Sequence, residues 1–121
     1  MTAIAPTTVD ETSAPALTWP RVFAGTVFAV LAIIIVATYG DYGISWDEQP
    51  QNTYGNMLLD YYTSGFADRA AFSYINLFLY GGFFDLLAAV ANKVSPFGVY
   101  ETRHLVGGLV FLAGLWGGWK L

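Results

Sequence analysis

Residues 22–39 read VFAGTVFAVLAIIIVATY, a run of 18 residues without a charged side chain. At a rise of about 1.5 Å per residue, a helix of this run is about 27 Å long, close to the roughly 30 Å thickness of bilayer hydrocarbon. A core helix of a soluble protein is rarely apolar on every side over such a length. The run therefore predicts a transmembrane helix over residues 22–39.

The composition of the whole chain agrees with a lipid solvent. Hydrophobic residues make up 55% of the 121 residues and charged residues 12%, whereas a soluble domain is about 25% charged. Aromatic residues reach 17%, and tyrosine and tryptophan concentrate at membrane–water boundaries. The net charge of −4 gives no basic surface, so nucleic acid is excluded as a partner. The absence of cysteine excludes thiolate metal sites and a cysteine nucleophile.

The stretch before the first apolar run is rich in Thr, Ala and Pro and has no hydrophobic period. We expect residues 1–20 to form a disordered cytoplasmic tail. Because no basic residue precedes Arg21, this stretch is a poor signal peptide, and we expect the first helix to be an uncleaved anchor. Cleavage near Ala37-Thr38-Tyr39-Gly40 is the alternative.

A polar loop over residues 40–71 follows the first span. It contains an apolar stripe at the spacing of one helix face, formed by Tyr54, Met57, Leu58, Tyr61 and Tyr62. Asp47 can cap this helix, and Pro50 is tolerated in its first turn. Thr63-Ser64-Gly65 ends it. An amphipathic helix directly after a span is expected to lie flat on the membrane interface.

Two further apolar runs complete the chain. The run over about 72–94 is interrupted by Gly81-Gly82 and Asp85, so its span starts near Phe72 or near Gly82. The third run covers about 104–121, and its glycines allow neighbouring helices to approach closely. We therefore predict an all-α, multi-pass membrane protein with about three transmembrane helices and one juxtamembrane amphipathic helix, in which residues 21–121 form a single transmembrane domain.

Lysine and arginine indicate the orientation of the spans. With three spans, Arg21, Lys93 and Arg103 share one side of the membrane, and Arg69 and Lys120 share the other. Arg21 adjoins the first helix, which usually dominates. We therefore predict a cytoplasmic N-terminus and a loop 40–71 outside.

The acidic pair Asp47-Glu48 is the first candidate site. Two carboxylates near a bilayer and beside Trp46 would lie in a reduced dielectric, which raises a carboxyl pKa and suits general-base catalysis. The structural alternative is that Asp47 caps the following helix and that Glu48 interacts with the dipole of its first turn.

Two further candidates contain charged residues close to apolar runs. Asp85 lies inside the second run, where a carboxylate is functional by default; alternatively it lies near a span end or bonds a neighbouring helix. Arg103 and His104 are either a membrane anchor and an interfacial imidazole or part of a site. Since His104 is the only histidine, a multi-histidine metal site is excluded.

The order and spacing of these motifs resemble the GT-C superfamily of glycosyltransferases, and most closely family 39 and the bacterial protein O-mannosyltransferase-like enzymes. The stretches that carry the likeness are Ser45-Trp46-Asp47-Glu48-Gln49, Tyr54-Gly55, Tyr80-Gly81-Gly82-Phe83-Phe84-Asp85 and Tyr100-Glu101-Thr102-Arg103-His104-Leu105. The likeness covers residues 22–121, as the N-terminal part of a longer enzyme. The Pro-rich turn that often precedes the second span in this family is replaced here by Tyr80-Gly81-Gly82.

The resemblance implies transfer of a sugar, with inversion, from a polyprenyl-phosphate donor to a protein, lipid or glycan acceptor on the non-cytoplasmic side of a membrane, expected to be the bacterial inner (plasma) membrane. Asp47 matches the catalytic residue of the family and Glu48 its partner. Tyr54, Asp85, Arg103 and His104 are the expected substrate-binding residues. No metal ligand is assigned, although a divalent metal stays open as a cofactor.

Two other functions are compatible with the sequence. One is a small, non-enzymatic integral membrane subunit, favoured by the short length and the looseness of each motif. The other is a transporter fragment that uses Asp85 as a proton or ion site.

Overall fold

The computed structural model of the chain describes residues 18–121, and all regular elements in this part are helices. In chain order these are α1 (Trp19–Thr38), α2 (Glu48–Thr63), the 3-10 turns η1 (Ala70–Ser73) and η2 (Leu77–Leu79), α3 (Phe83–Val94) and α4 (Val99–Lys120). No strand occurs among these described residues. The prediction of an all-α protein is confirmed for this part of the chain, and most of the predicted tail, residues 1–17, lies outside it.

The first helix begins slightly earlier than the apolar run. Trp19 and Pro20, predicted to belong to the tail, form the first turn of α1, because a proline near the start of a helix has no hydrogen bond to lose. No residue of α1 is buried. It is the one helix in residues 18–121 whose length and composition suit a membrane crossing.

The amphipathic helix is present where the stripe predicted it. α2 starts directly after Asp47 and buries Tyr54 and Leu58 from the stripe. These side chains form a small core with Ala71 of η1. The chain leaves α2 through Gly65, whose φ of 67° is in the left-handed region that glycine adopts at no steric cost.

The second apolar run is not one continuous helix, so the predicted span from near Phe72 is wrong. Residues 70–79 form the two 3-10 turns, and α3 has only 12 residues, about 18 Å of helix, which is too short to cross bilayer hydrocarbon alone. The helix starts directly after Gly82, its N-cap, close to the later of the two predicted starts. Gly81 provides the turn with a φ of 80°.

Close backbone contacts hold α2 and α3 together. A side chain on Gly55 would collide with the backbone of Asp85, and one on Gly82 would collide with Leu58. The glycines of Tyr80-Gly81-Gly82 therefore act both as a helix entry and as a packing notch.

The last helix is longer than predicted. α4 begins at Val99 rather than near residue 104, because the polar stretch Tyr100–His104 forms its first turns and is not a separate link. The Glu101 carboxylate accepts a hydrogen bond from the Gly98 N–H at 3.0 Å, which satisfies one of the free donors at the helix start. Of the glycines in α4, Gly108 adjoins Ile35 of α1, whereas Gly114, Gly117 and Gly118 have no close neighbour.

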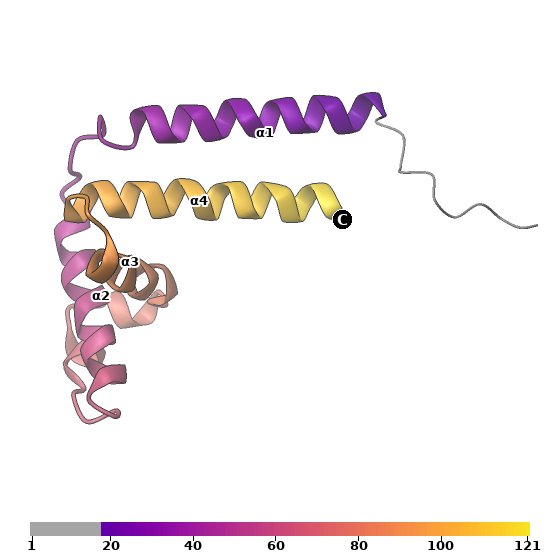
Figure 1. Cartoon of the computed structure of the whole chain (residues 1–121). Coiled ribbons are helices and arrows are strands. Elements are labelled where there is room, and N and C mark those ends of the chain that lie inside the picture. Colours follow the sequence, from indigo (N-terminus) through magenta and orange to yellow (C-terminus); the bar gives the residue numbers. More distant parts are fainter. Residues whose placement is uncertain (1–17) are drawn as a thin grey trace, which may run out of the picture.

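The helices form two groups. α1 and α4 run side by side in opposite directions, and α2 and α3 lie across one end of this pair (Figure 1). We call this the cavity end, where α1 finishes and α4 starts. The far end contains the first turn of α1 and the last turn of α4.

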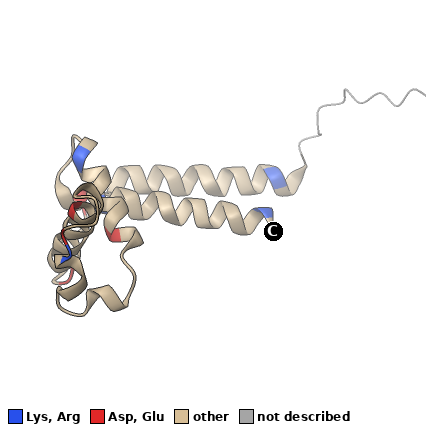
Figure 2. Ribbon diagram, turned by 90° about the horizontal axis from the view of Figure 1, so that it is seen from below, with Lys and Arg blue, Asp and Glu red and all other residues tan. Residues whose placement is uncertain are grey.

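This arrangement corrects the predicted distribution of basic residues. Arg21 and Lys120 belong to the turns at the far end of the pair, whereas Arg103 is at the cavity end with the loop that follows α1. Within residues 18–121, the acidic residues gather toward the cavity end, away from the far end (Figure 2). Arg103 and Arg21 thus lie at opposite ends of the α1–α4 pair and not at the same end, as three spans would place them, because α3 does not carry the chain back between them. The predicted sides of the membrane stay a prediction.

Candidate functional site

A cavity of about 820 Å³ lies at the cavity end, where the end of α1 meets the first turns of α2, α3 and α4. One part of its wall is charged or polar, from Asp47, Glu48, Gln51, Asp85, Arg103 and His104. The rest is apolar or small and includes Ile35, Leu77, Phe84, Gly107 and Gly108. The cavity thus brings together five of the six predicted site residues, from three different helices and the cap of one of them.

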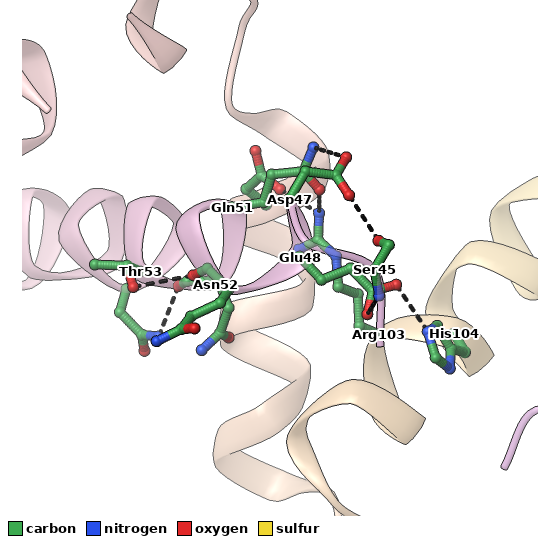
Figure 3. A network of polar contacts seen from close by, with 11 residues as sticks. Ser45, Asp47, Glu48, Gln51, Asn52, Thr53, Arg103 and His104 are labelled. Carbon is green, nitrogen blue, oxygen red and sulfur yellow. Dashed lines mark hydrogen bonds and ion pairs between the residues drawn. The ribbon is translucent and has the colours of Figure 1, made fainter. Parts of the chain in front are cut away.

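Arg103 and Asp85 form a buried ion pair between α4 and α3. The Arg103 Nη2 lies 2.6 Å from Asp85 Oδ1, and the two side chains are 7% and 13% exposed. The same nitrogen donates to Gln51 Oε1 of α2 at 2.6 Å (Figure 3). The guanidinium also lies over the Phe84 ring, 5.0 Å from its centroid. Asp85 therefore bonds a neighbouring helix, as one of its two interpretations stated, and Arg103 is no free membrane anchor.

His104 connects the same helix to α1 and α2. Its Nε2 lies 2.9 Å from Glu48 Oε1, and its Nδ1 lies 3.2 Å from the backbone oxygen of Tyr39. The Tyr42 ring packs edge-on against the imidazole, with centroids 5.5 Å apart. His104 is therefore part of the cavity wall and not an isolated interfacial side chain.

Asp47 occupies the N-cap position of α2, but its side chain does not cap the helix. Oδ1 instead accepts a hydrogen bond from the Ser45 hydroxyl at 2.6 Å, and Oδ2 is 3.5 Å from Gln51 Nε2. The Ser45 hydrogen bond, with smaller contributions from a backbone N–H and from the charge of Arg103, lowers the pKa of Asp47 below its ordinary value of 3.8. The expectation of a raised pKa is wrong, because hydrogen bonds to the charged form outweigh the weak desolvation.

Glu48 follows in the first turn of α2, the position in which a negative charge stabilises the helix dipole. One carboxylate oxygen faces His104, and the other accepts a hydrogen bond from the Ser45 N–H at 3.3 Å. The dipole interpretation and a place in the cavity wall are thus compatible for this residue.

Tyr54 is the one predicted site residue that does not line the cavity. It is 3% exposed and belongs to the core with Leu58 and Ala71, because its ring fills the space beside Gly82. Burial, and to a lesser extent the charge of Asp85, raises the pKa of the Tyr54 hydroxyl. The structure therefore assigns Tyr54 to packing beneath the cavity.

Three partners in the site, Gln51, Ser45 and the Tyr39 carbonyl, are not predicted by any single motif. A signal for Gln51 was present, because it follows Asp47 by four positions and Glu48 by three, which places all three on one helix face. Nothing in the sequence indicated the Tyr39 carbonyl, which reaches His104 only through the pairing of α1 with α4. Among residues 18–121, no three His, Asp or Glu side chains form a group suited to hold a metal ion.

Comparison with known proteins gives no match for this chain. No protein-family profile fits it, and no characterised protein or solved structure is significantly similar to it. The resemblance to the GT-C superfamily therefore stays a prediction from the motifs.

Proposed function

We propose that this chain is part of a multi-pass membrane glycosyltransferase of the GT-C type, which takes a sugar from a polyprenyl-phosphate donor and passes it to an acceptor on the non-cytoplasmic side. The observation that carries the proposal is the mixed wall of the cavity. Carboxylates, a guanidinium and an imidazole line one part of it, and Ile35, Leu77 and Phe84 line another. A ligand with a charged head and a hydrocarbon tail needs both surfaces in one place.

In this proposal α1 and α4 cross the membrane, and α2 and α3 lie along its outer surface. α4 has 22 residues, about 33 Å of helix, so its length suits a crossing, whereas α1 alone within residues 18–121 also has the composition of a span. At its far end the Lys120 Nζ lies 5.8 Å from the centroid of the Trp116 ring, next to the end of α1 that carries Trp19 and Arg21. Tryptophan and basic residues at one end of a helix pair are typical of a cytoplasmic interface.

Asp47 and Glu48 are the proposed reacting carboxylates. A lowered pKa keeps Asp47 charged at neutral pH, so it is suited to accept a hydrogen bond from an acceptor hydroxyl and orient it toward the anomeric carbon. Arg103 places positive charge in the wall of the same cavity, and His104 adds an imidazole. Asp85 holds Arg103 in position through the ion pair.

Two measurements test the proposal. In membranes containing the protein and a radiolabelled polyprenyl-phosphate sugar, Asp47→Asn is expected to lower transfer by about 10²-fold or more. Asp41→Asn, which removes a carboxylate of the same loop outside the cavity wall, is the matched control and is expected to keep transfer. Normal turnover by Asp47→Asn would refute the role of Asp47.

The second measurement locates the donor. A photoactivatable polyprenyl phosphate, with the reactive group near the head, is expected to label the cavity wall around Phe84 and Gly107, and unlabelled donor is expected to compete. Labelling spread evenly over α1 and α4 would contradict the cavity as the donor site.

A non-enzymatic membrane subunit is the second candidate. The observation that favours it is an apolar groove of about 370 Å³ between α1 and α4, lined by Phe23, Ala24, Val27, Phe28, Gly114, Leu115, Gly118 and Trp119. A groove of that kind suits a helix of another protein. Absence of donor labelling in the cavity, together with co-purification of a partner helix that crosslinks to this groove, would favour the subunit.

A further inference from the structure

The imidazole of His104 lies between two hydrogen-bond acceptors. Nδ1 faces the Tyr39 carbonyl oxygen at 3.2 Å, and Nε2 faces a carboxylate oxygen of Glu48 at 2.9 Å. A carbonyl oxygen and an ionised carboxylate have no proton to give. A neutral imidazole has one N–H donor and one lone pair, so it satisfies only one of these acceptors and directs its lone pair at the other. Only the imidazolium donates to both.

The charges around the ring favour the same form. Tyr39 is the C-cap of α1, where helix carbonyls carry partial negative charge. From α2 the ring meets Glu48, with Asp47 next to it. The neighbouring cation on α4, Arg103, is already paired with Asp85 of α3 at 2.6 Å. From the loop, the ring meets Tyr42 in a T-shaped contact that brings no formal charge.

The formal charges of the side chains in the cavity wall also favour an imidazolium. Without a charge on His104, the polar wall has three carboxylates and one guanidinium. Glu48 then has no cation within ion-pair distance among residues 18–121, and the hydrogen bonds of the Asp47 side chain go to the uncharged Ser45 and Gln51. A proton on the ring supplies this cation to Glu48.

We propose that His104 is held as an imidazolium and acts as a positioning residue, which ties the end of α1 to the start of α2 and fixes Glu48 beside Asp47. Its two hydrogen bonds act on opposite sides of the loop 40–47, so they set the geometry of the acidic pair from α4. The relevance of this positioning for sugar transfer rests on the proposed function. The protonation state of the ring can be tested independently of that function.

The single histidine makes the proposal measurable. With ¹⁵N-labelled histidine in the full chain in lipid nanodiscs at pH 7, NMR is expected to show a proton on both ring nitrogens. In Glu48→Gln the side-chain amide can donate to Nε2, so a neutral ring with its proton on Nδ1 satisfies every partner, and the ring is expected to carry one proton. Asp41→Asn removes a carboxylate outside the cavity wall and is expected to leave two protons on the ring.

A single ring proton in the unmodified protein at pH 7, or an unchanged ring in Glu48→Gln, would overturn the proposal. Circular dichroism of Glu48→Gln checks that the helices persist. If the helices do not persist, the variant His104→Gln tests the connection between α1 and α2 instead, because it removes the ring and keeps the Arg103–Asp85 pair. Spin labels at positions 31 and 59 are then expected to report a wider distance between α1 and α2. An unchanged distance would also overturn it. These readouts need no sugar donor, so failure of the transferase proposal leaves them interpretable.

Discussion

The two ends of the α1–α4 pair differ in almost every property. At the cavity end, buried Arg103 pairs with Asp85, and polar contacts join all four α-helices. At the far end, apolar side chains are open to the surroundings: Trp19 is 78% exposed and Trp116 is 58% exposed. α1 and α4 thus run between an end that contains ion pairs and an end that has none among the described residues.

The difference shows which physical effect organises each end. An apolar surface as open as the far end is unstable in water but suits lipid, where hydrophobic side chains gain nothing by packing together. A buried arginine, by contrast, is tolerated only when its charge is paired. The cavity end therefore depends on specific partners, and the far end depends on the solvent around it.

The largest expected effect comes from breaking the buried ion pair. Arg103→Met leaves the largely buried carboxylate of Asp85 unpaired, which is expected to lower the free energy of unfolding by up to about 3 kcal/mol. Unfolding by SDS in mixed micelles, followed by circular dichroism, measures the loss. Arg69→Met, at an exposed arginine without an ion pair in the described residues, is the control and is expected to change stability by less than about 0.5 kcal/mol.

The double variant Arg103→Met with Asp85→Leu tests the cause of that loss. Removal of both charges is expected to restore most of the stability, because apolar residues of similar volume often replace a buried pair at no cost. If Arg103→Met alone is as stable as Arg69→Met, the description of the cavity end as charge-organised is wrong.

A pair of glycine substitutions is expected to change stability in opposite directions at the two ends. Gly55→Ala forces α2 away from the backbone of Asp85 and is expected to cost about 1–3 kcal/mol. Gly114→Ala, with open space around the new methyl group, is expected to add about 0.5–1 kcal/mol by removing a flexible residue from a helix interior. The same micelle titration measures both, and a loss at Gly114 would mean that another helix packs there.

The smallest expected effect concerns the pKa of Asp47. Ser45→Ala removes the hydrogen bond that is the main cause of the lowered pKa, so the pKa is expected to rise toward 3.8. A carboxyl group whose pKa is lowered on folding stabilises the folded state at pH values above its ordinary pKa, here 3.8. This stabilisation is lost as the pH falls through the folded-state pKa. Ser45→Ala therefore loses part of this contribution at neutral pH.

A ¹³C NMR titration of the Asp47 carboxyl carbon measures the change. Ser73→Ala, which removes a hydroxyl bonded only to the backbone of η1, is expected to leave the Asp47 titration unchanged. An equal shift in both variants would show that the Ser45 hydroxyl is not the cause.

The long helices and the amphipathic helix were predictable because each follows from a local pattern. An uncharged run of 18 residues at 22–39 predicts α1, and the stripe around Tyr54 and Leu58 predicts α2. The prediction of a continuous helix from near Phe72 failed, because hydrophobicity alone does not distinguish a spanning helix from two turns and a short helix. Gly81 with its positive φ, and the notch at Gly82, divide that run, and their effect depends on packing against α2.

The site was predictable in its residues but not in its connections. Asp47, Glu48, Asp85, Arg103 and His104 stand out because charge is scarce in this chain. Which carboxylate pairs with which cation depends on how α4 returns alongside α1, and no local pattern contains that information. The direction of the Asp47 pKa depended on the Ser45 hydroxyl, whose orientation is set by the turn before α2.

Arg103 and His104 are consecutive, so their side chains leave α4 about 100° apart around its axis. One is bonded to α2 and α3, and the other to α1 and α2. Rotation of α4 about its axis in either direction stretches one of these two sets of bonds, so the two neighbouring side chains fix the rotational position of the helix. A molecule that enters the cavity and draws either side chain toward itself would therefore rotate α4 about its axis and displace the partners of the other side chain.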